Sequence, residues 1–241
     1  MNPANAINLE LMAATLVSAA QHPCVFLFWD GVDFTRLYAK NRDPFFQVGT
    51  DLLLLQRPAG AMHAFRRGLD AGEDPRDHLY WLGWASLAKG DRAAAERAWS
   101  LWGAKDDTTM YVANLRAART ALDEADTLGA RRHLLDAVRT GIGRPEAHAA
   151  LGELLLSRHN KYALLETQVT TRLNPLDWLA RRELVEGLIA ARLDGPAQIE
   201  LAALKNIHPG YTADTVAARL ERVLVGRSPD ARAVIDFRPQ H

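Results

Sequence analysis

Small residues recur along this chain with a period of about 34 positions, and large apolar residues follow them at a fixed distance. The first set, spaced by 34, 35 and 34 positions, is Gly49, Gly83, Ala118 and Gly152. The second set, which follows each of the first three by twelve positions, is Ala61, Ala95 and Ala130. Small side chains at two fixed points let two antiparallel helices approach closely. The pattern therefore predicts an all-α array of stacked helix pairs, one pair per period.

The same pattern divides the chain into four parts. Residues 42–174 are predicted to hold four helix pairs, and the Asn174–Pro175 step ends the fourth. Residues 175–226 are predicted to form a degenerate fifth pair and a terminal helix that covers the open end of the stack. Residues 1–41 combine an atypical helix with an apolar segment, Cys24–Trp29, interpreted as a short buried strand or a tight loop. Residues 227–241 are a tail with weak periodicity.

A frame with units beginning at Arg42, Arg76, Tyr111 and Pro145 brings these residues into register. Position 8 is then Gly or Ala, position 20 is Ala in the first three units, and position 24 is large in the same units, as Phe65, Trp99 and Leu134. This combination resembles the tetratricopeptide repeat family. The resemblance implies a right-handed superhelix in which the first helix of each pair lines a concave groove.

The resemblance also implies that positions 5, 9 and 12 of each first helix face this groove, because residues at that spacing share one helix face. These positions hold Phe46, Thr50 and Leu53, then Tyr80, Trp84 and Leu87, then Leu115, Arg119 and Leu122, and finally Ala149, Glu153 and Leu156. Phe46, Tyr80 and Trp84 are predicted to form an exposed apolar patch of the kind that marks an interface. We expect a partner protein or peptide with apolar or aromatic anchors to dock there.

Other interpretations stay open from the sequence. The aromatic patch is alternatively covered by the chain's own N-terminal segment, through Phe26, Phe28 and Trp29. The first hypothesis for function is a non-enzymatic adaptor. The alternative is an accessory or substrate-presenting subunit of an enzyme, with residues 22–38 contributing to the partner site. A third is a homo-oligomer that forms through exposed apolar ends of the array.

Composition narrows the classes of partner. Of the 241 residues, 29 are Lys or Arg and 29 are Asp or Glu, so no net charge attracts nucleic acid or an anionic membrane. No segment approaches the roughly 20 apolar residues of a membrane span, and the N-terminus lacks the positive charge of a signal peptide. The single cysteine, Cys24, is typical of a reducing compartment. We therefore expect a cytoplasmic protein with no nucleic-acid or membrane partner.

Motifs for catalysis and cofactor binding are absent from the sequence. The phosphate-binding, zinc-protease and serine-hydrolase signatures do not occur. Five histidines are predicted to lie on helix surfaces or to pack between repeats instead of binding zinc, which needs three or four convergent ligands: His63, His78, His133, His148 and His159. The sequence therefore predicts no catalytic residue, no metal site and no cofactor.

Overall fold

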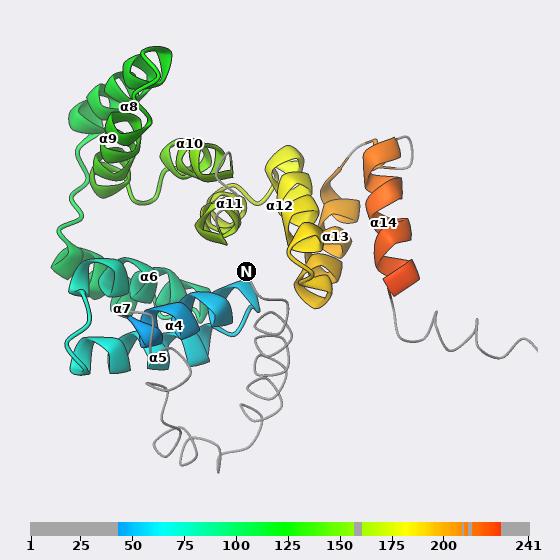
Figure 1. Cartoon of the computed structure of the whole chain (residues 1–241), viewed down its shortest axis with the longest axis horizontal. Helices are drawn as coiled ribbons and strands as arrows, with labels where there is room; N and C mark the ends of the chain where they lie inside the picture. Colours follow the sequence, from blue (N-terminus) through cyan, green and yellow to red (C-terminus); the bar gives the residue numbers. More distant parts are fainter. Residues whose placement is uncertain (1–42, 157–160, 209, 212–213, 228–241) are drawn as a thin grey trace, which may run out of the picture.

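A computed structural model describes residues 43–156, 161–208, 210–211 and 214–227. These residues contain helices and no β-strand. The helices are α4 (Pro44–Leu54), α5 (Pro58–Asp70), α6 (Pro75–Ala88), α7 (Arg92–Trp102), α8 (Thr108–Asp123), α9 (Thr127–Thr140), α10 (Pro145–Leu156), α11 (Lys161–Leu173), α12 (Trp178–Ala190), α13 (Asp194–Ile207) and α14 (Thr215–Arg227) (Figure 1). The predictions for residues 1–41, and for the tail after Arg227, lie outside the described residues.

Proline and aspartate fix where many of these helices begin. Proline is the first residue of α4, α5, α6 and α10, where its missing N–H has no intrahelical partner to lose. At the start of α7, α8, α9 and α12, an aspartate carboxylate accepts a hydrogen bond from the backbone N–H three residues later. These four caps are Asp91, Asp107, Asp126 and Asp177. The local sequence therefore specifies the helix boundaries independently of the packing.

The repeating small residues receive the large residue of the second helix. A Cβ added at Gly49 would lie 2.4 Å from the ring of Phe65, and one added at Gly83 would lie 2.1 Å from Nε1 of Trp99. Positions 8 and 24 of the repeat therefore meet across each of the first two helix pairs. The described residues form five pairs, α4–α5 through α12–α13, and α14 packs against both helices of the last pair. The predicted all-α array of helix pairs with a terminal helix is confirmed.

The stacking of these pairs is interrupted between the second and the third. Within each half of the molecule the second helix of one pair packs on the first helix of the next, but α7 and α8 share the fewest contacts of any consecutive helices. The α8–α9 pair stands away from α6–α7 at this point, and the chain turns back so that α11 contacts α4 (Figure 1). The array thus consists of a first stack, α4–α7, and a second stack, α8–α14.

The segment between the two stacks is short and ordered. Gly103, with φ of +90°, ends α7 in the left-handed conformation that favours glycine. The backbone N–H groups of Lys105 and Asp107 then donate to the carbonyl groups of Arg139 and Thr140, each at 2.9 Å. The segment therefore pairs with the end of α9. None of the described helices is long and apolar enough to cross a membrane.

Candidate functional site

The aromatic residues predicted to line an open groove are inside the molecule. The exposed fractions of Phe46, Tyr80 and Trp84 are 7%, 5% and 1%. Thr50 and Leu53 are also buried, and Leu87 is half-buried. The expectation of an exposed aromatic patch is therefore wrong. We call this face of α4 and α6 the first groove, defined by Phe46, Thr50, Leu53, Tyr80 and Trp84.

The fourth helix pair, α10–α11, covers the first groove along α4. The ring of Phe46 stacks on that of Tyr162, with centroids 5.9 Å apart. The amide of Gln47 donates to the Tyr162 hydroxyl at 3.3 Å, and Lys161 forms an ion pair with Asp51 at 2.9 Å. The alternative cover, by the N-terminal Phe26, Phe28 and Trp29, concerns residues outside the described ranges. The occupant seen here is a part of the chain more than 100 residues away from α4.

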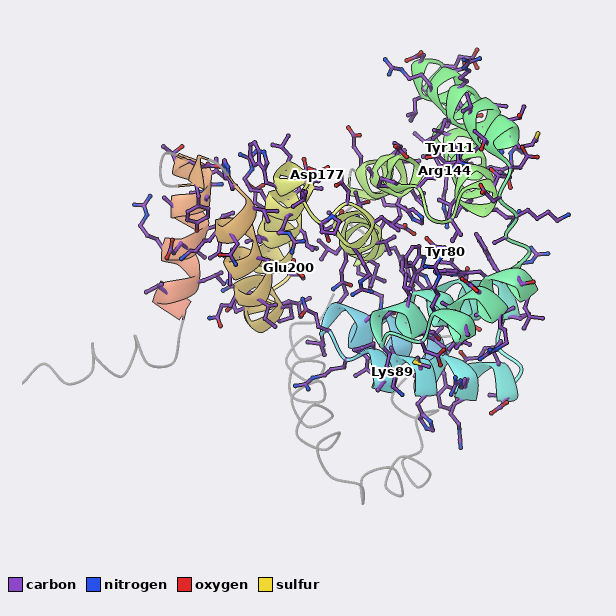
Figure 2. The ribbon with its side chains drawn as sticks, turned by 180° about the vertical axis from the view of Figure 1, so that it is seen from behind. Tyr80, Lys89, Tyr111, Arg144, Asp177 and Glu200 are labelled. Carbon is purple, nitrogen blue, oxygen red and sulfur yellow. The ribbon has the colours of Figure 1, made fainter. Side chains whose placement is uncertain are left out.

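A buried polar cluster joins α6 to α10 and α11. The Tyr80 hydroxyl, which lies between the two stacks in Figure 2, donates to the Glu166 carboxylate at 3.0 and 3.1 Å. Nδ1 of His148 lies 2.9 Å from the same carboxylate, and its Nε2 lies 3.0 Å from the carbonyl oxygen of Ile142. Both ring nitrogens of His148 therefore have an oxygen partner, and these two contacts fix the ring between α11 and the segment before α10. Burial, followed by the charge of Glu166, raises the pKa of Tyr80 well above its usual 10.

Trp84 belongs to the same core. Its ring stands nearly perpendicular to that of His148, with centroids 5.2 Å apart, and it contacts the ring of Trp99 at 4.8 Å. One apolar cluster contains Trp84 together with Leu165 and Val169 of α11. Trp84, predicted to line an exposed docking patch, is therefore a core residue of the closed molecule.

Helix α11 is the element whose role the sequence did not indicate. Residues 163–171 are all buried, although five of them are Glu, Gln or Thr. Thr167 and Thr170 donate their hydroxyl protons to the carbonyl groups of Ala163 and Glu166, at 2.9 Å each. A buried helix can therefore carry these threonines because their hydroxyl groups are satisfied within it. One signal of this role is present in the sequence: Glu166 is a charged residue in the fourth helix pair, which follows the repeat pattern less closely than the first three.

The remaining predicted site residues lie on the second stack and are accessible. Leu115 is half-buried on α8, and Arg119 on α8 and Glu153 on α10 are exposed. Glu153 borders a pocket of about 260 Å³ formed by α10, α11 and α12. The pocket is lined by Ala149, Glu153, Thr167, Thr170, Ala180 and Glu183, and we call it the α10–α12 pocket.

The polar side chains of the α10–α12 pocket accept hydrogen bonds. The hydroxyl protons of Thr167 and Thr170 are already donated to backbone carbonyl groups, and the carboxylate oxygens of Glu153 and Glu183 are acceptors. Burial raises the pKa of Glu183, and the negative charges of Glu153 and Glu186 raise it further. A positively charged group in the pocket would lower the pKa of Glu183 and supply the missing donors. The described residues contain no group of three or more His, Cys, Asp or Glu side chains that could hold a metal ion.

Comparison with solved structures finds similar proteins at low sequence identity. YrrB, a tetratricopeptide repeat protein with an unusual peptide-binding site, is 16% identical and matches 79% of this chain and 98% of its own, with a TM-score of 0.37. The chain resembles tetratricopeptide repeat proteins in structure. The TPR2AB domain of yeast Sti1, in a complex named for pHSP90, is 10% identical over 79% of this chain and 88% of its own, with a TM-score of 0.40.

A third similar structure is that of TTC0263, a thermophilic tetratricopeptide repeat protein of Thermus thermophilus. It is 20% identical over 75% of this chain and 97% of its own, with a TM-score of 0.35. No family model and no curated protein matches the sequence. At these identities the likeness concerns the fold, so the function is argued below from the residues of this chain.

Proposed function

We propose that this chain is a non-catalytic interaction scaffold whose docking site for a partner protein is the α10–α12 pocket. The observation that carries the proposal is the polar lining of the pocket, which offers two carboxylates and two hydroxyl oxygens as acceptors. A complementary ligand brings hydrogen-bond donors and positive charge. In a protein partner these are the side chains of lysine and arginine.

Exposed apolar residues near the pocket extend the surface for such a partner. Leu179, the residue before Ala180 of the pocket, is 47% exposed, and Leu176, just before α12, is 76% exposed. The apolar stem of a lysine or arginine, together with a neighbouring apolar side chain, packs favourably against such leucines. The proposed ligand is therefore a segment with a basic residue next to an apolar one.

Charge reversal in the pocket tests this proposal. Glu153→Lys with Glu183→Lys places two cations where the ligand cation is expected, and Glu96→Lys with Glu124→Lys makes the same change in charge at exposed positions elsewhere. An immobilised array of peptides, each in a form with lysine and a form with norleucine, is exposed to the three proteins. We expect lysine-dependent binding by the wild type and by the control variant, and a loss of at least tenfold in the pocket variant. Equal binding by all three proteins, or equal binding of the lysine and norleucine forms, would reject the pocket as the docking site.

A further inference from the structure

We propose that the first groove is also a self-association surface, and that its occupant there is the α10–α11 pair of a second copy of this chain. In the resulting dimer, the second stack of each copy packs on the first stack of the other. The surface is distinct from the α10–α12 pocket and does not depend on the function proposed for it.

The contacts that close the first groove all join a residue before the inter-stack segment to a residue after it. They include the Tyr80–Glu166 hydrogen bond, the Asp51–Lys161 ion pair, and a 3.0 Å hydrogen bond from Gln56 to Glu200 of α13. None of these contacts requires both partners to belong to one chain. Two copies can therefore form each of them twice, once in each groove.

The connection between the stacks allows the exchange. Because α7 and α8 share few contacts, separating the stacks breaks little packing between these two helices, and the apolar packing to be released next to the connection is that of Trp102 and Ala104. Lys105 and Asp107 remain paired with α9, so the change in direction falls at Gly103 and Ala104. Gly103 is well suited to this role, since it already has positive φ and a side chain there would meet nothing within 4 Å. The local contacts to release include the 2.9 Å hydrogen bond from the Ala104 N–H to the Trp99 carbonyl and the contact of the Arg139 guanidinium over the Trp102 ring, at 5.0 Å.

The burial of the closing contacts favours a second copy over an open monomer. Opening alone would bring Phe46, Tyr80 and Trp84 into water and would separate the Glu166 carboxylate from the Tyr80 hydroxyl. Loss of such apolar burial is strongly unfavourable. Exchange restores the contacts that close the first groove, so its main unfavourable contribution is the entropy of association, which protein concentration offsets. The structure therefore points to exchange that increases with concentration.

Cross-linking across the closing contact distinguishes the two forms. Asp51 and Lys161 are paired and partly exposed, so Asp51→Cys with Lys161→Cys is expected to be tolerated. The native cysteine is removed as Cys24→Ser, since it is the only one in the chain. A short bismaleimide then joins the two new cysteines within one chain of a closed monomer, and between two chains of an exchanged dimer. The matched control is Lys205→Cys with Glu221→Cys, a pair between α13 and α14 that stays within one chain in both forms.

The full-length variants are incubated over a hundredfold range of concentration near the onset of unfolding, cooled, cross-linked and separated under denaturing conditions. We expect a covalent dimer, at twice the 26.7 kDa of the chain, to increase at least fivefold over this range for the 51/161 pair and to be absent for the 205/221 pair. Deleting Ala104 should increase the dimer fraction further at a fixed concentration, because a shorter connection hinders closure within one chain. Monomer bands alone at every concentration would overturn the proposal. A dimer in ultracentrifugation whose 51/161 cross-link stays within one chain would overturn it as well, because that dimer would use another surface.

Discussion

Removing the Tyr80 hydroxyl tests whether the first groove is closed. Tyr80→Phe keeps the ring, which lies 4.8 Å from that of Trp102, and deletes the donor to Glu166. Because the hydroxyl is buried and its partner is a carboxylate, we expect the free energy of unfolding to fall by about 1.5 to 3 kcal/mol. For a chain of this size the melting temperature should then fall by roughly 3 to 12 °C.

The assay is urea and thermal unfolding followed by circular dichroism, with Tyr211→Phe as the control. The Tyr211 hydroxyl also donates to a carboxylate, Glu221 at 3.2 Å, but this tyrosine is only partly buried on the second stack. Since water can replace the lost partner, the control should lose about 1 kcal/mol at most. If Tyr80→Phe is no more destabilising than Tyr211→Phe, the Tyr80 hydroxyl is accessible to water and the groove is not closed.

Of three further predictions, two concern core packing and one concerns a helix cap. Gly83→Ala should lower the free energy of unfolding by about 1 to 3 kcal/mol, because the new Cβ would lie 2.1 Å from the Trp99 ring and force it to move. Trp84→Ala should lower the free energy of unfolding by about 3 to 5 kcal/mol. The control Leu101→Ala, at a side chain that is 75% exposed, should change it by about 0.5 kcal/mol or less. Denaturant titration measures the free energy of unfolding of these two variants and of Gly83→Ala. Asp214 has a pKa of about 2, below its usual 3.8, because backbone N–H groups of α14 and a histidine donate hydrogen bonds to its carboxylate. The stabilising effect of this carboxylate is therefore present above pH 4 and is lost as the pH falls from about 4 to 2. Urea midpoints for Asp214→Asn should therefore depend less on pH than those of the wild type over that interval.

The helix pairs could be predicted from the sequence because their determinants lie close together in it. Gly49 meets Phe65 and Gly83 meets Trp99 within one period of the repeat. Aspartate and proline mark the helix starts locally. A periodic sequence pattern therefore predicts contacts between the two helices of one pair.

The closure of the first groove could not be predicted, because it depends on contacts between distant segments. Phe46, Tyr80 and Trp84 have the same positions in the pattern whether a partner, water or another part of the chain covers them. The sequence does show a second tryptophan, Trp102, three residues after Trp99, and in the structure its ring contacts Tyr80 and lies under the guanidinium of Arg139 on α9. This tryptophan marks the place where the regular stacking ends.

The contact between Phe46 and Tyr162 gives the most direct test of the closed arrangement, because the two residues lie 116 positions apart and their ring centroids 5.9 Å apart. We would measure nuclear Overhauser effects in protein that is deuterated except at its phenylalanine and tyrosine rings. A cross-peak between the rings of Phe46 and Tyr162, lost in Tyr162→Leu, is predicted both for the closed monomer and for the exchanged dimer. The contact between Phe46 and Phe65, at 6.1 Å within one helix pair, is the internal reference. A spectrum with the Phe46–Phe65 cross-peak and without any from Phe46 to Tyr162 would contradict the account, because it would show a folded first stack whose groove is open.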